Sequence, residues 1–217
     1  MISEKYRSLL KEIADAAIQS GRDPGEIQLV VVSKTVESGD IQEVYDVGCR
    51  DFGENRVQEA LSKQAELPED IRWHLIGSLQ LNKVRKIIGQ FDLIHSVDSL
   101  KLAEKISEVS EEMGLISRIL LQVNTSREES KHGFSEDEVM RVSPAIMELK
   151  GVEVEGLMTM APFVEDRSVI RSCFVKLREI RDELRLRHLS MGMTHDWREA
   201  VEEGATILRV GSAIFRS

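Results

Sequence analysis

Cysteine is scarce in this 217-residue chain, which contains only Cys49 and Cys173. Two thiols cannot build a disulfide framework, and they supply too few ligands for a structural zinc site made of cysteines. We expect both to be buried free thiols, which is typical of a protein in the reducing cytoplasm. The five histidines show no spacing of the HExxH kind, so we predict no metal.

Long apolar runs are absent as well. No stretch approaches the ~18 apolar residues of a membrane span. Charged residues interrupt the first 20 positions, which therefore lack the uncharged apolar core of a signal peptide. An excess of positive charge is also missing, because 29 Lys and Arg stand against 38 Asp and Glu, a net charge of −9. Such a surface repels phosphate backbones and anionic lipids, so we expect no nucleic-acid or membrane partner. One small anion in a local pocket remains compatible with this charge.

Only four prolines and 14 glycines occur, and no low-complexity linker divides the chain, so we predict that residues 1–217 form one domain. Within it, short apolar runs alternate with longer amphipathic segments. Eight runs have the composition of strands buried on both faces. They are Ile27–Ser33, Arg50–Gly53, Arg72–Gly77, Leu93–Val97, Ile119–Asn124, Val154–Met160, Leu189–Gly192 and Ile207–Val210.

Helical periodicity occupies the segments before and between these runs. It predicts a first helix over Ser3–Ser20 and later helices around Leu102–Met113, Val139–Leu149 and Val169–Leu184. Alternating strands and helices indicate an α/β protein with a parallel sheet. Eight strands favour a closed (β/α)8 TIM-type barrel with an extra N-terminal helix over an open sheet, whose GxGxxG and GxxxxGK[ST] fingerprints are absent. No long apolar stripe is left over, so we expect a monomer.

Functional residues of such barrels lie where strands end and loops begin. The last two strands end in Ser190, Gly192 and Thr194 and in Gly211 and Ser212. Glycines let backbone amides approach an anion closely, hydroxyls add donors, and Thr194 is placed to cap the following helix. These segments predict a phosphate site, although the alternative is that they only turn the chain.

Lys34 follows a buried strand and should enter the barrel mouth partly desolvated, where its amine could form an imine; the alternative is an exposed lysine at a strand end. A lysine beside a phosphate site suggests pyridoxal 5′-phosphate or a phosphosugar Schiff base. Arg209 stays protonated and only donates, so opposite a pyridine nitrogen it would leave that nitrogen unprotonated; the alternative is an ion pair at the rim. His74 fits a core histidine or a pocket residue, and Asn55 a helix cap or a pocket residue.

Several of these segments together resemble the pyridoxal phosphate homeostasis proteins. They occur in the family order and cover essentially the whole chain. The segments are Val32-Ser33-Lys34-Thr35, Phe52-Gly53-Glu54-Asn55-Arg56-Val57-Gln58-Glu59, Trp73-His74-Leu75-Ile76-Gly77-Ser78-Leu79-Gln80, His95-Ser96-Val97-Asp98-Ser99, Val123-Asn124-Thr125-Ser126, Gly156-Leu157-Met158-Thr159-Met160, Leu189-Ser190-Met191-Gly192-Met193 and Arg209-Val210-Gly211-Ser212-Ala213-Ile214-Phe215.

The resemblance implies a barrel of the alanine racemase type (fold type III), without that enzyme's second, β-rich domain. It implies that Lys34 forms the internal imine with pyridoxal 5′-phosphate and that Arg209 faces the pyridine nitrogen. It also implies a phosphate site made by Ser190, Gly192, Thr194, Gly211 and Ser212, and a pocket lined by Asn55 and His74. Glu129 and Lys131 match a loop implied to pass the cofactor on, and Arg216 stands where the family commonly has glycine, which concerns the exit of the chain from the last strand.

The implied function is intracellular supply of pyridoxal 5′-phosphate, with cofactor-dependent apo-enzymes as partners and without robust catalytic turnover. The alternative is a racemase-like enzyme acting on amino acids. Racemisation normally needs a base on each face of the substrate, and Lys34 offers one. The only tyrosines, Tyr6 and Tyr45, lie in predicted helices outside the mouth, which weakens that alternative. A phosphosugar aldolase or isomerase is a third reading.

Overall fold

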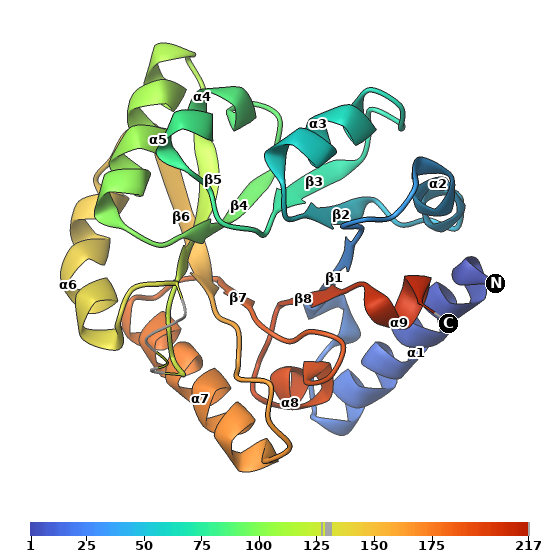
Figure 1. Cartoon of the computed structure of the whole chain (residues 1–217). Helices are drawn as coiled ribbons and strands as arrows, with labels where there is room; N and C mark the ends of the chain where they lie inside the picture. Colours follow the sequence, from blue (N-terminus) through green and yellow to red (C-terminus); the bar gives the residue numbers. More distant parts are fainter. Residues whose placement is uncertain (127, 129–131, 217) are drawn as a thin grey trace.

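Eight parallel strands close into a barrel in the computed structural model, which describes residues 1–126, 128 and 132–216. Each strand pairs with its neighbours in chain order, and β8 returns to pair with β1 (Figure 1). The strands are β1 Gln28–Val32, β2 Asp51–Glu54, β3 Arg72–Leu75, β4 Leu93–Val97, β5 Ser117–Gln122, β6 Val152–Met158, β7 His188–Ser190 and β8 Ile207–Val210. All eight predicted strands are present, and the predicted TIM-type barrel is confirmed.

Helices surround the barrel and cover its outer face (Figure 1). They are α1 Ile2–Gln19, α2 Ser38–Asp46, α3 Val57–Gln64, α4 Val84–Ile87, α5 Leu100–Glu112, α6 Glu136–Met147, α7 Arg167–Glu183, α8 Trp197–Glu202 and α9 Ser212–Phe215. The predicted N-terminal helix is α1, which packs against α2, α8 and α9. The two termini therefore lie on the same side of the molecule.

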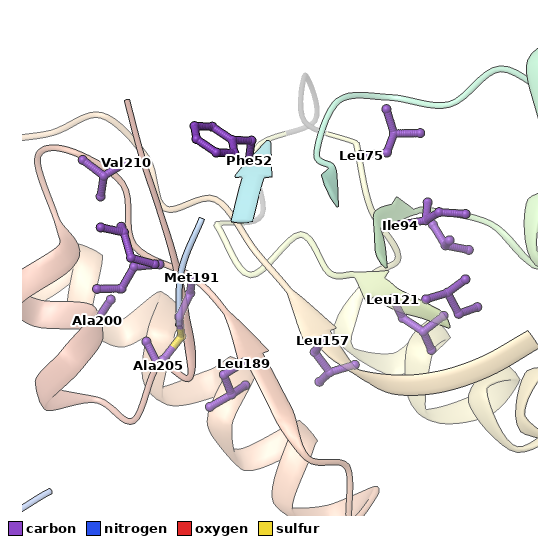
Figure 2. Close-up of a cluster of buried hydrophobic side chains, with 14 of the residues drawn as sticks. Phe52, Leu75, Ile94, Leu121, Leu157, Leu189, Met191, Ala200, Ala205 and Val210 are labelled. Atoms are coloured by element: carbon purple, nitrogen blue, oxygen red, sulfur yellow. The ribbon is translucent and has the colours of Figure 1, made fainter. Parts of the chain in front are cut away.

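Successive side chains of a strand point to opposite faces, one toward the helices and one into the barrel. The core therefore consists of two apolar clusters. The larger cluster lies between the strands and the helices and includes Phe52, Leu75, Leu121 and Val210 (Figure 2). A smaller one comprises Val30, Leu93, Leu120, Met158 and Ile207. Buried polar side chains accompany the smaller cluster, among them His74, His95, Ser190 and Arg209. This polar content sets the barrel apart from a purely apolar interior.

Among the described residues both cysteines are buried and neither forms a disulfide, as the sequence predicts. Burial raises the pKa of the Cys49 thiol to about 11, so that thiol stays protonated at neutral pH. Within the described residues, no helix is long and apolar enough to cross a membrane. The same part of the chain contains no cluster of three or more His, Cys, Asp or Glu side chains that could hold a metal ion.

Candidate functional site

A cavity of about 460 Å³ lies at the carboxyl ends of the strands, where the loops after β1, β2, β7 and β8 converge. This is the end at which barrels of this type carry their functional residues. The structure brings six of the nine predicted site residues into its wall. They are Lys34, Asn55, Thr194, Arg209, Gly211 and Ser212.

Lys34 stands in a tight turn directly after β1. Ser33 is fully buried, its carbonyl accepts a hydrogen bond from the Val36 N–H at 3.0 Å, and Thr35 adopts a left-handed conformation with φ of 60°. A threonine in this region carries backbone strain, and such strain is common at functional sites. The Lys34 side chain is exposed, so the expected partial desolvation of its amine is wrong. Lys34 therefore lines the cavity and is also exposed to solvent.

A buried ion pair anchors this turn from behind. Lys63 of α3 donates to the carboxylate of Glu54 and to the carbonyl of Ser33, both at 2.7 Å. The Ser33 hydroxyl donates to the same Glu54 oxygen at 2.7 Å. Glu54 is fully buried, and its Oε2 has no hydrogen-bond partner among the described residues. We call Ser33, Glu54 and Lys63 the turn anchor, because it fixes the carbonyl that precedes Lys34.

Asn55 lies in the cavity wall and does not cap α3, since the residue before that helix is Arg56 and no side chain caps it. The backbone of Asn55 is held closely by Gly77 of the next loop. A Cβ atom at position 77 would lie 2.1 Å from the Asn55 carbonyl oxygen, so only glycine fits there. The close approach of these two loops keeps Asn55 at the mouth of the barrel.

The predicted phosphate segments meet as expected, although one predicted detail is wrong. The Thr194 and Ser212 hydroxyls lie 2.8 Å apart across the two loops. Thr194 does not cap the following helix, because α8 begins later and its N-cap residue is Asp196. The buried Asp196 carboxylate instead accepts from the Met193 N–H at 2.5 Å, which closes the loop upon itself. Thr194 is thereby left on the cavity side, beside Ser212.

Gly192 supports these segments from below and is not part of the wall. Its φ is 94°, and its carbonyl accepts from the Arg209 N–H at 2.9 Å. A Cβ atom at this position would lie 2.5 Å from the Cβ of Ala200. The glycine therefore allows both an unusual backbone conformation and the close packing of α8 under the cavity.

We expect Gly192→Ala to destabilise the fold more than Gly204→Ala does. Both glycines have a positive φ, of 94° and 97°, but a Cβ atom at position 204 would meet nothing closer than 3.5 Å. The two variants share the backbone strain and differ in the clash with α8, so their unfolding free energies should differ by about 1–3 kcal/mol. Urea unfolding measures both values, and equal losses would contradict this account of Gly192.

Arg209 forms the floor of the cavity. Its guanidinium donates from Nη1 to the Ser190 hydroxyl at 2.5 Å and from Nη2 to the Thr159 carbonyl at 2.8 Å. Burial lowers the pKa of Arg209 to about 10, and the nearby Asp196 opposes this, so the side chain stays charged at neutral pH. These hydrogen bonds go to neutral groups inside the barrel, which differs from the ion pair at the rim considered as an alternative.

His74 and Ser190 lie beneath the cavity and do not reach its wall. His74 is buried between Asp51 and His95, with ring-nitrogen distances of 3.1 Å and 3.0 Å. The Ser190 hydroxyl lies between His95 and Arg209, at 2.8 Å and 2.5 Å. Sequence reasoning missed Asp51 and His95 as functional candidates. The signal for them was strand alternation: Asp51 and His95 are each next to an apolar residue that faces the helices, so both should point into the barrel, as His74 does.

Two further expectations have different outcomes. Arg216 is part of the cavity wall, so its side chain matters for the site as well as for the exit of the chain from β8. Glu129 and Lys131, which match the loop implied to pass the cofactor on, lie outside the described residues.

Comparisons with known proteins identify the family of the chain. A family model described as the N-terminal domain of alanine racemase matches residues 16–217. Relatives in Aquifex aeolicus and Pseudomonas aeruginosa, both named pyridoxal phosphate homeostasis protein, are 41% and 40% identical to this chain. The matches cover 98% and 99% of this chain and 96% and 94% of the relatives.

Solved structures share the fold over the whole chain. PipY of Synechococcus elongatus, solved without PLP and with PLP bound, has TM-scores of 0.91 and 0.87 at 40% identity, over 99% of this chain and 100% of PipY. An alanine racemase from Bartonella henselae has a TM-score of 0.79 at 16% identity, over 100% of this chain and 58% of the racemase. The racemase therefore shares the barrel, and its identity is too low to carry more than the fold.

Proposed function

Because the chain belongs to the alanine racemase N-terminal domain family, and within it to the pyridoxal phosphate homeostasis proteins, we propose that it binds pyridoxal 5′-phosphate covalently through Lys34 and serves the intracellular supply of this cofactor. One observation carries the proposal. A primary amine, a pair of hydroxyls and a charged guanidinium line a single cavity at the carboxyl ends of the strands. This donor set matches the aldehyde, the phosphate and the ring nitrogen of that cofactor.

The chemistry of these residues fits the cofactor group by group. When bound, pyridoxal 5′-phosphate supplies an electrophilic carbon and an electron-withdrawing ring. The Lys34 amine is the nucleophile for that carbon. The Thr194 and Ser212 hydroxyls now bond to each other at 2.8 Å and can both turn toward a phosphate. Arg209 only donates, so opposite the ring nitrogen it would favour the unprotonated ring and reduce its capacity to withdraw electrons.

The absence of robust turnover is part of the proposal and is supported by where the tyrosines lie. Tyr6 is buried in α1. The Tyr45 hydroxyl of α2 donates to Asp70 at 2.6 Å, in the loop before β3. That loop is at the end of the barrel opposite the cavity. Neither phenol can therefore act as the base that faces Lys34 across a bound amino acid.

The finer parts of the role remain proposals. We infer that the recipients are apo-enzymes that depend on the cofactor, that the protein acts as a monomer, and that it works in the cytoplasm. The cytoplasmic location is supported by the two buried cysteines, which form no disulfide among the described residues. The exposure of the Lys34 side chain supports release, because a ligand held at the open mouth can leave without a change of fold.

Borohydride reduction of protein incubated with pyridoxal 5′-phosphate tests the proposal. The reduced protein should gain the mass of one pyridoxyl phosphate group, and peptide mass spectrometry should place it on Lys34. The exposed Lys101 at the start of α5 is the internal control and should stay unmodified. A protein that cannot be loaded would contradict the proposal. Exchange of an amino acid's α-proton with deuterated solvent at turnover rates would favour the racemase alternative.

A further inference from the structure

A line of hydrogen bonds crosses the inside of the barrel and ends on Arg209. Asp51 at the start of β2 contacts His74 Nε2 at 3.1 Å, and His74 Nδ1 contacts His95 Nε2 at 3.0 Å. His95 Nδ1 contacts the Ser190 hydroxyl at 2.8 Å, and Arg209 donates to that hydroxyl at 2.5 Å. We call Asp51, His74, His95 and Ser190 the relay. It joins residues of β2, β3, β4 and β7 that are far apart in the sequence.

The relay connects two separate cavities. Its upper end, Ser190, contacts Arg209, which forms the floor of the cofactor cavity. Its lower end opens into a second cavity of about 210 Å³ at the amino-terminal end of the strands, with Asp51 and His74 in the wall. Every member of the relay is buried, so its polar atoms need hydrogen-bond partners within the protein. Asp51 has two such partners outside the relay, Arg72 and the Gln28 side-chain amide, which donates to it at 2.7 Å.

The lower end of the relay is a fixed negative charge. Burial would raise the pKa of Asp51, but hydrogen bonds from Arg72 and His74 hold it well below its usual value. Arg72 donates to both carboxylate oxygens, at 2.8 Å and 2.6 Å. Asp51 therefore stays a carboxylate, which can accept hydrogen bonds but cannot donate them.

That acceptor sets the direction of the bond from His74, which must donate from Nε2. A His74 ring with its one hydrogen on Nε2 accepts at Nδ1 from the Nε2–H of His95. Burial, with the nearby His74 and Arg209, lowers the pKa of His95 well below its usual value, so His95 is neutral and accepts at Nδ1. Ser190 then donates to His95, and a lone pair of its oxygen faces Arg209.

We propose that Asp51 is a positioning residue for Arg209, acting through the relay. The carboxylate selects the Nε2–H tautomer of both histidines, and the histidines orient the Ser190 hydroxyl so that it accepts from the guanidinium. The consequence for a bound cofactor rests on the proposed function. The consequence for Arg209 itself does not, because it concerns only hydrogen bonds within the chain.

The ring hydrogens of His74 and His95 also fix where an additional proton on this pair would lie. His74 Nε2 already carries hydrogen toward Asp51, and only one hydrogen fits between the two rings. A proton taken up by the histidine pair therefore places its added hydrogen on His95 Nδ1, and Ser190 must then accept from both His95 and Arg209. The charged and titratable groups around the lower end of the relay are Asp51, Arg72, Asp92, Arg118, Glu155 and His188. With that added hydrogen, His95 and Arg209 would be competing donors to the one Ser190 oxygen.

Nitrogen-15 NMR of the histidine rings, without cofactor, tests the relay directly. Wild type at neutral pH should show the Nε2–H tautomer for both His74 and His95. Asp51→Asn should shift these ring resonances and the Arg209 guanidinium resonances, because an amide can donate as well as accept. Glu155→Gln is the matched control, since Glu155 also accepts from an arginine of a neighbouring strand, Arg118, and lines the same cavity. The control should leave Arg209 unchanged.

The cofactor-loaded protein gives the second readout. Asp51→Asn should weaken pyridoxal 5′-phosphate binding about fivefold, the effect of roughly one hydrogen bond, and should alter the pH dependence of the absorption spectrum, whereas Glu155→Gln should do neither. Ser190→Ala cuts the relay at its upper end and should move the Arg209 resonances even though the Asp51–Arg72 pair is intact. An Nδ1–H tautomer in wild type, or equal behaviour of the Asp51 and Glu155 variants, would overturn the proposal. If wild type binds no cofactor, the proposed function fails, while the ring tautomers still decide the relay.

Discussion

Lys34→Ala is expected to abolish the covalent retention of pyridoxal 5′-phosphate. The variant should be colourless after gel filtration, and borohydride should fix no cofactor to the chain. Lys34 is the sole lysine among the described residues that line the cavity. No other side-chain amine there can replace it as the nucleophile. Absorption spectra and intact-protein mass spectrometry measure this outcome.

Two companion variants separate the covalent bond from the charge and from the fold. Lys34→Arg keeps a cation at the mouth but cannot form an imine, so it should also lose the fixed cofactor. Lys101→Ala removes an exposed lysine outside the cavity and should bind as wild type does. The Lys34→Ala protein should still bind the cofactor reversibly through the Thr194 and Ser212 hydroxyls, and pyridoxal without its phosphate should bind more weakly. Cofactor fixed by borohydride to Lys34→Ala would show that another residue is the nucleophile.

The barrel itself was predictable from local patterns. Runs such as Val30 to Val32 are apolar on both faces of the sheet. The direction of this strand places Gln28 at the amino-terminal end of the barrel and Lys34 at the carboxyl-terminal end. The converging strand ends then predicted which loops meet, and six predicted residues do share one cavity. These features depend on residue type and sequence spacing alone.

The details that failed depend on short-range geometry that spacing does not contain. Asp196 takes the cap position expected for Thr194, since a carboxylate two residues later reaches back to the Met193 N–H. Lys34 is exposed and stands in a turn in which Thr35 is left-handed, and the strand pattern contains no signal for that conformation. His95 was overlooked as a functional candidate because its partners come from β3 and β7, and the register of the closed barrel alone brings them together.

Lys63→Met is expected to cause the largest loss of stability among the substitutions considered. The Lys63 amine is the cation that compensates Glu54, whose side chain is fully buried, with an Nζ–Oε1 distance of 2.7 Å. Removal of one partner leaves a buried charge uncompensated, which costs about 3–5 kcal/mol. For a domain of this size each kcal/mol corresponds to a shift of about 2–4 °C in Tm, so the variant should have a Tm lower by about 10 °C.

A surface ion pair provides the matched control. Lys105 bonds to Glu108 within α5, and both side chains are exposed, so Lys105→Met should change the unfolding free energy by less than about 0.5 kcal/mol. Comparing the same lysine-to-methionine change at the two sites distinguishes the effect of breaking a buried ion pair from the effect of losing a lysine. Equal losses of unfolding free energy in the two variants would show that the turn anchor does not stabilise the fold more than a surface ion pair does.

The double variant Lys63→Met/Glu54→Gln distinguishes the two roles of the turn anchor. A neutral amide removes the uncompensated charge and can still accept from the Ser33 hydroxyl, so most of the lost stability should return. The bond from Lys63 to the Ser33 carbonyl does not return, and that carbonyl directly precedes Lys34. Retention of pyridoxal 5′-phosphate should therefore stay below wild type even when the fold is restored. Full recovery of both properties would mean that the anchor stabilises the barrel without positioning Lys34.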